Sequence, residues 1–229
     1  MNAYYEKIKF VKSKLESYLT EIFKVYGNEL LLKLEDYNLL QNEKNCIESS
    51  TATGFIMEEF VVSKLETYSQ SHNNTNEIRI ERIPNHGTQT SSYDCAVKYK
   101  GVFFMINVKV DKRSNNAVSA INILHNDYVV KDPEQEKAYI VLKTKYSFGE
   151  GARTKTRKIL IKGVTAYALE EVDFSQGHLQ DHRNWSEIFN SASGRLQVSK
   201  RFRTKNALKE DEISYETTKQ FVEAMYQPK

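Results

Sequence analysis

Residues Asp94 to Lys109 read Asp-Cys-Ala-Val-Lys-Tyr-Lys-Gly-Val-Phe-Phe-Met-Ile-Asn-Val-Lys, which is two apolar runs separated by Lys100 and Gly101. Runs rich in Val, Phe, Tyr and Ile on both sides of a glycine-containing link predict a β-hairpin. If these two residues form the loop, Asp94 faces Asn107 with the two Cβ atoms roughly 5 Å apart, and Lys109 follows on the same face. The predicted hairpin therefore brings a carboxylate, an amide and an ammonium group together.

The second strand of this hairpin, Val102 to Val110, is apolar on both faces except at Asn107 and Lys109. That pattern is typical of a central strand that is covered on both sides. A buried ammonium group is costly unless it is paired, so an ion pair between Lys109 and Asp94 is one interpretation. The other is a divalent-metal site that hydrolyses phosphodiesters. In such a site carboxylate oxygens hold a hard cation, and a nearby lysine orients the attacking water and offsets phosphate charge.

The order of these residues is an acid, twelve residues, a ligand-type residue, one residue and a lysine, and it resembles the PD-(D/E)xK nuclease motif. The close spacing is similar to that of type II restriction endonucleases of the HincII and EcoRV type. The resemblance implies an α/β (α+β) fold with a restriction-endonuclease-like mixed central β-sheet flanked by helices. It also implies a Mg2+ cofactor bound by Asp94 and the residue at position 107, with Lys109 as a catalytic residue.

Two positions depart from the family pattern. Tyr93 stands where Pro is usual, and Asn107 stands where the family has Asp or Glu. The second departure matters, because a neutral amide oxygen is a weaker metal ligand than a carboxylate. Asn107 is therefore a natural variant compensated by another acid, an engineered substitution that traps an uncleaved complex, or the mark of a member that has lost its chemistry.

A helix is predicted from Gly54 to Leu65, with Phe55, Met57, Phe60, Val61 and Leu65 as its apolar body. Glu58 shares a face with Val61 and Leu65, so its carboxylate is expected to point inward. By resemblance, these nucleases place a glutamate of an early helix, in the context Gly-x-x-x-Glu-x-x-apolar, beside the catalytic acid. Glu58 has this spacing from Gly54, which makes it a further candidate catalytic residue and metal ligand. Glu59 is the rival candidate, and the alternative is that both are solvated helix charges.

The N-terminal residues predict an amphipathic helix that ends at Gly27, because apolar residues recur at alternating spacings of four and three. These residues are Tyr4, Ile8, Val11, Leu15, Tyr18, Ile22 and Val25. A second short helical pattern covers Asn28 to Leu40, and Gln41 to Thr53 is polar and loop-like. We interpret residues 1–40 as a helical segment that either packs on the sheet or pairs with a second subunit.

The remaining periodic segments add strands and helices to the hairpin. Glu77 to Ile83 is predicted as a strand and Ala117 to Val130 as a helix, while Lys137 to Phe148 and Ile159 to Leu169 form a second hairpin. Glu212 to Met225 is predicted as a closing amphipathic helix. A chain of 229 residues can bury one good core, so we expect residues 1–229 to form a single restriction-endonuclease-like domain.

Basic appendages within residues 149–209 are candidate DNA contacts, because clustered cations bind phosphates by salt-dependent attraction. The tip of the second hairpin carries Arg153 and Lys155. Residues 191–205 alternate polar and apolar side chains, which predicts a strand with its cationic face outward. The candidates on that strand are Arg195, Gln197, Lys200, Arg201 and Arg203. By resemblance, the segment after Lys109 also approaches DNA, which adds Arg113, Ser114, Asn115 and Asn116. The alternative for the basic tip is a solvated loop.

Composition limits the remaining classes. The net charge of +3 predicts nothing about nucleic acid by itself, so the local patches are the better clue. Cys46 and Cys95 are far apart and lack a CxxC or His spacing, which indicates neither a zinc site nor a disulfide framework. No apolar run reaches the about 18 residues of a membrane helix. We expect a cytoplasmic protein with no membrane partner.

The resemblance implies a homodimeric type II restriction endonuclease of a restriction-modification system. Such an enzyme cleaves both strands of a short palindromic site in double-stranded DNA by Mg2+-dependent phosphodiester hydrolysis and leaves 5′-phosphates. One alternative is a structure-selective PD-(D/E)xK nuclease of the junction-resolvase type. Another is a catalytically inactive DNA-binding member, because Asn107 replaces the usual acid.

Overall fold

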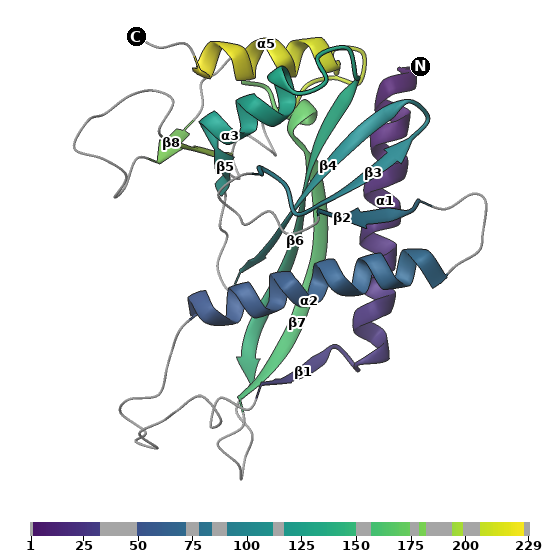
Figure 1. The fold of residues 1–229 in the computed structure, drawn as a ribbon. Coiled ribbons are helices and arrows are strands. Elements are labelled where there is room, and N and C mark those ends of the chain that lie inside the picture. Colours follow the sequence, from purple (N-terminus) through teal and green to yellow (C-terminus); the bar gives the residue numbers. More distant parts are fainter. Residues whose placement is uncertain are drawn as a thin grey trace.

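The computed structural model describes residues 2–32, 50–71, 78–83, 91–111, 117–149, 157–174, 179–181, 194–198 and 207–226. These residues form a mixed α+β fold around a curled, mixed six-stranded sheet with the strand order β1-β7-β6-β4-β3-β2 (Figure 1). A smaller sheet has the order β5-β9-β8. The expected class, a mixed sheet with helices packed on it, agrees with this architecture.

The strands of the large sheet are β1 (Glu29–Leu32), β2 (Ile80–Arg82), β3 (Cys95–Tyr99), β4 (Val102–Asp111), β6 (Lys137–Gly149) and β7 (Arg157–Ala168). The strands of the small sheet are β5 (Ala117–Ala120), β8 (Leu179–Asp181) and β9 (Arg195–Gln197). The helices are α1 (Ala3–Val25), α2 (Ser50–Ser71), α3 (Ile121–His125) and α5 (Tyr215–Tyr226), with a π-helix η3 (Asn126–Val130) and a 3₁₀-helix η4 (Leu169–Glu171).

The predicted hairpin is formed by β3 and β4, with Tyr99 paired to Val102. Lys100 and Gly101 have φ angles of 46° and 82°. Positive φ at both central residues is what a two-residue type I′ turn requires, and it matches the twist of the two strands. On its other edge β4 pairs in parallel with β6. The prediction that this strand is central in the sheet is therefore confirmed.

The two faces of the sheet contribute to two separate hydrophobic cores, because side chains alternate along each strand. Val108 of β4 belongs to the first core, which also contains the buried residues of α1 and α2. Met105 of β4 and Val141 of β6 belong to the second core, together with residues of α3, η3 and α5. Figure 1 shows α3 and α5 at one end of the sheet and α2 crossing the strands toward the other end. Asn107 and Lys109 continue the row of Met105 and so leave β4 on the second face.

The N-terminal helix agrees with its apolar spacing. Asn2 caps α1, because its Oδ1 accepts hydrogen bonds from the backbone N of Tyr4 and Tyr5, each at 3.1 Å. The predicted apolar positions from Tyr4 to Ile22 are all buried in the first core, against the sheet of the same chain. Val25 was expected in the same stripe but is 81% exposed, because α1 ends at this residue and the chain turns away.

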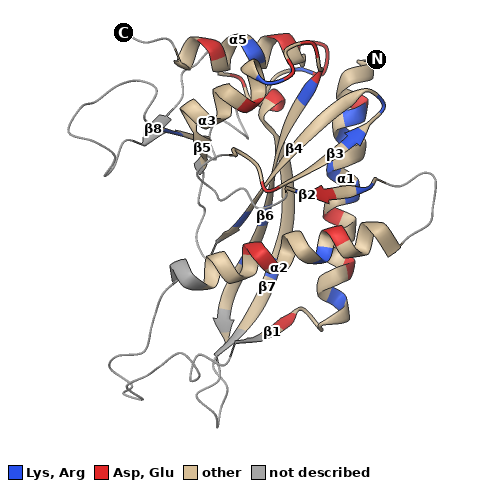
Figure 2. Cartoon of the chain, viewed as in Figure 1, with Lys and Arg blue, Asp and Glu red and all other residues tan. Residues whose placement is uncertain are grey.

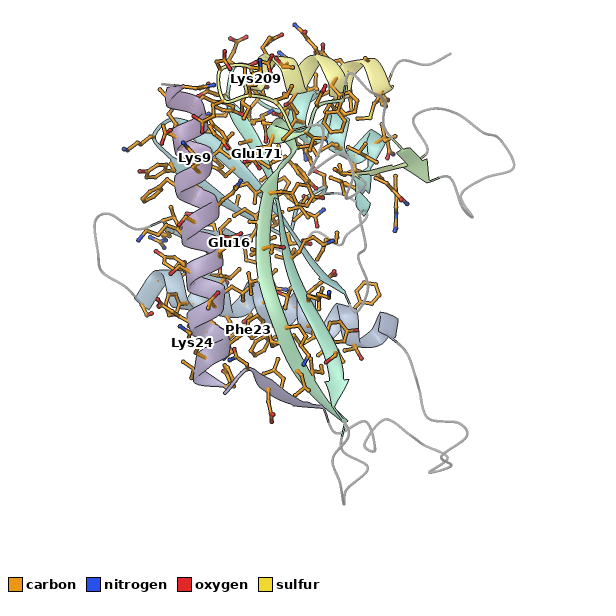
Figure 3. The ribbon with its side chains drawn as sticks, turned by 180° about the vertical axis from the view of Figure 1, so that it is seen from behind. Lys9, Glu16, Phe23, Lys24, Glu171 and Lys209 are labelled. Carbon is orange, nitrogen blue, oxygen red and sulfur yellow. The ribbon has the colours of Figure 1, made fainter. Side chains whose placement is uncertain are left out.

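Acidic side chains near α1 bind the edge of β7 that extends beyond β1. The backbone N of Ala166 donates to Glu16 Oε1 at 2.6 Å, and the backbone N of Ala168 donates to Glu171 Oε2 at 2.8 Å. Lys12 of α1 pairs with Glu171. Figure 3 shows α1 running along β7, with Glu16 midway along the helix and Glu171 near its N-terminal half. These carboxylates satisfy strand N–H groups that have no strand partner.

The predicted helical pattern over Asn28 to Leu40 is wrong at its start. Glu29–Leu32 form β1, which pairs antiparallel with β7 so that Glu29 faces Leu160. A short apolar run does not distinguish strand from helix by periodicity, and here a distant partner decides the outcome. Residues 33–40 lie outside the described residues. The polar loop predicted over Gln41 to Thr53 is wrong at its end, because α2 already begins at Ser50.

The prediction of a single helix over Ala117 to Val130 is also wrong in part. Its first four residues form β5, because they pair with β9, which comes much later in the chain. The helical part follows as α3 and η3. Phe55 of α2 was expected in the core but is 61% exposed, since the helix turns Met57, Val61 and Leu65 inward instead.

The other predicted elements are confirmed with shifted ends. The strand predicted over Glu77 to Ile83 is β2, which is shorter, and the second predicted hairpin is formed by β6 and β7. The predicted closing helix is α5, with Val222 and Met225 in the second core. Among the described helices, none has both the length and the apolar composition required to cross a membrane.

Candidate active site

Two carboxylates lie side by side along the edge of β4 where this strand extends beyond β3. The backbone N of Asp94 donates to Ile106 O at 2.9 Å, just before β3 begins. Farther along β4, the N of Val108 donates to Asp94 Oδ2 at 2.7 Å, and the N of Val110 donates to Glu58 Oε1 at 3.4 Å. Asp94 and Glu58 therefore bind N–H groups two residues apart on one edge of the central strand.

Helix α2 brings Glu58 to this edge because it packs across β4. Its Gly54, one turn earlier, lies so near that a Cβ at that position would be 3.9 Å from Val110 O. Glu58 is half-buried, as the helix face that it shares with Val61 and Leu65 predicts. Glu59 is exposed and pairs with Arg82 of β2. Of the two candidate glutamates, Glu58 is thus the one beside Asp94.

The charges at this edge act on one another. Burial raises the pKa of Glu58, while the positive charge of Lys109 lowers it and the negative charge of Asp94 raises it. Burial likewise raises the pKa of Asp94, Lys109 lowers it, and the hydrogen bond from Val108 also lowers it. Lys109 thus lies within electrostatic range of both acids. Figure 2 shows acidic positions on α2 where it crosses the strands, and basic positions on the strands themselves.

Asn107 is 3% exposed, and its amide nitrogen lies within hydrogen-bonding distance of three acceptors. Ser92 O is at 3.2 Å, Val118 O at 2.6 Å and Tyr139 Oη at 2.8 Å, so the two hydrogens of Nδ2 are shared among them. Two of these partners are carbonyl oxygens, which can only accept, so the group facing them must be the NH2. Asn107 Oδ1 is buried and has no hydrogen-bond partner among the described residues. A buried amide oxygen without a partner in this part of the chain is an exception to the usual pairing of buried polar groups.

The residues before Asp94 are held from both sides. The N of Ser92 donates to Asp127 Oδ2 of η3 at 2.7 Å. Its O accepts from Asn107 Nδ2 and from Tyr139 Oη of β6. Sequence analysis did not single out Ser92, Asp127 or Tyr139, because nothing local in the sequence indicates that these three segments meet.

Lys143 of β6 is a further basic residue at the site that sequence analysis missed. It is the register partner of Lys109 in the parallel pairing of β4 with β6, and it is 9% exposed. Parallel partners leave neighbouring strands on the same face, about 5 Å apart. The sequence contains a pattern that could have indicated this residue, because Lys143 interrupts an apolar strand as Lys109 does.

The donor set fits a hard divalent cation of the Mg2+ type. In the described part of the chain no group of three or more His, Cys, Asp and Glu side chains is placed to hold a metal ion. Mg2+, however, is usually bound by one or two carboxylates together with water and substrate phosphates. Among the described residues, Asp94 and Glu58 each accept one hydrogen bond of the about four that a carboxylate can accept. Two acids with spare acceptor capacity match that mode of binding.

Most predicted DNA contacts lie outside the described residues. These are Arg113, Ser114, Asn115, Asn116, Arg153, Lys155, Lys200, Arg201 and Arg203. Arg195 and Gln197 are described in β9, where Arg195 is exposed while Leu196 and Val198 are buried, as the alternation predicts. β9 pairs with β5, whose Val118 O contacts Asn107. The two residues are thus joined to the site through β5.

Comparisons of the chain with protein-family models and with curated protein sequences give no match. The assignment of a function therefore depends on the arrangement of Asp94, Glu58 and Lys109 alone.

Proposed function

We propose that this protein is a Mg2+-dependent endonuclease of the PD-(D/E)xK type that hydrolyses phosphodiester bonds in double-stranded DNA. The observation that carries the proposal is the position of Asp94 and Glu58 on one edge of β4, with Lys109 acting on both. Acid, acid and lysine are the groups that the motif requires, and they come together from two segments that are separate in sequence.

The alternative interpretation, a structural ion pair, is less well supported. Within the described residues Lys109 lowers the pKa of both acids through its charge, without a direct ion pair to either. A lysine whose purpose is to neutralise a buried acid is expected to bond to it directly. Glu16 of α1 also binds a strand N–H group, but that group belongs to Ala166 of β7, whereas Lys109 lies on β4. The site at β4 differs in that the charge of Lys109 acts on both Asp94 and Glu58.

In the proposed reaction, the carboxylates of Asp94 and Glu58 would hold the cation, with Asn107 Oδ1 as a weaker acceptor. Bound Mg2+ would supply Lewis-acid stabilisation of charge on the phosphate. Lys109 hydrogen-bonds the attacking water, helps to remove its proton and offsets negative charge on the phosphate. The hydrogen bonds from Val108 and Val110 fix one oxygen of each acid, so the direction of both carboxylates is set before the cation binds.

The specific form we propose is a homodimeric type II restriction endonuclease that cuts a palindromic site and leaves 5′-phosphates. Two-fold symmetry places one site on each strand of such a sequence. The proposed DNA contacts are the predicted basic and polar residues Arg113, Ser114, Asn115, Asn116, Arg153, Lys155, Arg195, Gln197, Lys200, Arg201 and Arg203.

Incubation of the purified protein with Mg2+ and duplex plasmid DNA tests the proposal. Discrete fragments are expected. Cleavage restricted to branched DNA would replace the restriction activity with a junction-resolvase activity. DNA binding without cleavage under any divalent cation would identify the inactive member instead. A Lys98→Gln variant, which changes an exposed lysine of β3 near the hairpin turn, serves as the control for general loss of charge.

A further inference from the structure

Asn107 joins three separate segments through a single side-chain nitrogen. Its acceptors are Ser92 O in the segment before Asp94, Val118 O in β5 and Tyr139 Oη in β6. Because the side chain is 3% exposed, water does not replace these partners at little cost. The position is therefore shaped to receive a hydrogen-bond donor.

A carboxylate at this position is a poor fit. It would bring negatively charged oxygen against Ser92 O and Val118 O, which carry no hydrogens, and both carbonyls would lose the Asn107 donor, so that Ser92 O would keep only the bond from Tyr139 Oη. Only Tyr139 Oη has a hydrogen to offer, and it already donates that hydrogen to Ser92 O. The acid that the family pattern expects at position 107 is thus incompatible with the surroundings of this side chain.

The segment held by Asn107 leads directly into the candidate acid. Ser92 is fixed at its N by Asp127 and at its O by Asn107 and Tyr139. Two residues later the backbone N of Asp94 bonds to β4, and its carboxylate bonds to the same strand. Loss of the bond to Ser92 O would release the segment that sets the direction of this carboxylate.

We propose that Asn107 is a positioning residue that must be an amide: its nitrogen holds the Ser92 to Asp94 segment against β4, and Glu58 takes the place of the second acid. The asparagine is then the native solution of this site, neither a trap nor a lost catalytic group. The inference deepens the proposed nuclease function and rests on it for the metal-binding measurement. The role of Asn107 in holding the Ser92 to Asp94 backbone can be tested even if the protein is not a nuclease.

The test compares Asn107→Asp and Asn107→Leu with Val141→Ala, a core change at the register partner of Asn107 on β6. The first measurement is hydrogen exchange at the amides of Ser92 and Asp94. Exchange is expected to accelerate in both Asn107 variants and to stay near wild type in Val141→Ala. Equal acceleration in all three would mean general destabilisation and would overturn the positioning role.

The second measurement is thermal melting at about pH 5 and about pH 8. In the described part of the chain, the ionisable groups around this cluster are Tyr139, Tyr167, Asp94 and Asp127, with Lys109 two residues along β4. In Asn107→Asp the loss of melting temperature is expected to be larger at the higher pH, because a protonated carboxyl regains one donor and an ionised one has none. The loss in Asn107→Leu is expected to be similar at both. An Asn107→Asp protein as stable as wild type at both values would refute the amide requirement.

The third measurement is titration with Mn2+ alone, in the absence of DNA. Both Asn107 variants are expected to bind Mn2+ about 10- to 100-fold more weakly, as is typical when a residue that orients a ligand is lost. Tighter Mn2+ binding by Asn107→Asp, with activity above wild type, would show that position 107 lacks a catalytic acid and would overturn the inference. If the wild-type protein neither binds Mn2+ nor cuts DNA, the proposed function fails, whereas exchange and melting still decide the role of Asn107.

Discussion

Lys109 and Lys143 are partners in the parallel register of β4 and β6, so two lysines leave neighbouring strands on the same face of the sheet. Lys143 is 9% exposed and Lys109 is half-buried. Two lysines that leave neighbouring strands on one face add their positive potentials there, which favours the approach of an anion such as phosphate. We therefore expect both lysines to contact phosphate when DNA is bound.

Replacing Lys143 by Gln is expected to weaken DNA binding and to reduce the slope of log affinity against log salt concentration by about 1. The physical reason is that one fewer counterion is released when one phosphate contact is lost. Measurement of affinity at several salt concentrations, with Ca2+ in place of Mg2+, checks this. The Lys98→Gln control should leave the slope unchanged, and an equal slope in both variants would remove Lys143 from the interface.

Glu58→Gln is expected to lower cleavage about 10- to 100-fold, because an amide is a weaker ligand for a hard cation. The glutamine oxygen still accepts the hydrogen bond from Val110, so the helix and strand remain joined. Glu16→Gln is the matched control, since it changes the acid that binds the N–H of Ala166 in β7. Comparable loss of cleavage in both variants would mean that Glu58 only caps a strand. Initial cleavage rates and melting curves of the two variants make the comparison.

Lys109→Ala is expected to lower the cleavage rate about 100- to 10,000-fold while DNA affinity stays within a few-fold of wild type. The side chain acts on the water and on the scissile phosphate, whereas most affinity comes from other phosphate contacts. Rates and affinities from the same preparation decide between the two roles. Parallel loss of binding and cleavage would count against a catalytic lysine.

The hairpin and Glu58 could be predicted from the sequence because their signals are local. The positive-φ turn at Lys100 and Gly101 is a property of adjacent residues, and the inward direction of Glu58 follows from helical spacing. The role of Asn107 could not be predicted, since its three acceptors come from three separate segments. β1 and β5 were missed for the same reason, because each is a short strand whose partner lies far away in the sequence.

A buried acid outside the site predicts how stability depends on pH. Glu170 is fully buried in η4, and its Oε1 accepts from Tyr128 Oη at 2.7 Å and from the N of Tyr139 at 2.9 Å. Burial raises the pKa of Glu170 from 4.5 to about 7. A carboxyl whose folded pKa exceeds its unfolded value stabilises the fold fully below the unfolded pKa, and this contribution is lost as pH rises through the folded pKa.

The Glu170 contribution should therefore decline between about pH 4.5 and pH 7 and be absent in more alkaline solution, with a total on the order of 3 kcal/mol. Glu170→Gln keeps an acceptor for Tyr128 and Tyr139 but has no charge to bury, so its unfolding free energy should be flatter across this range and exceed that of wild type above neutral pH. Urea unfolding at a series of pH values measures both. Glu171→Gln, a change at the neighbouring acid that pairs with Lys12, is the control. If the unfolding free energies of wild type and Glu170→Gln differ by the same amount at every pH, the pKa of Glu170 is the same in the folded and unfolded states, and the prediction is wrong.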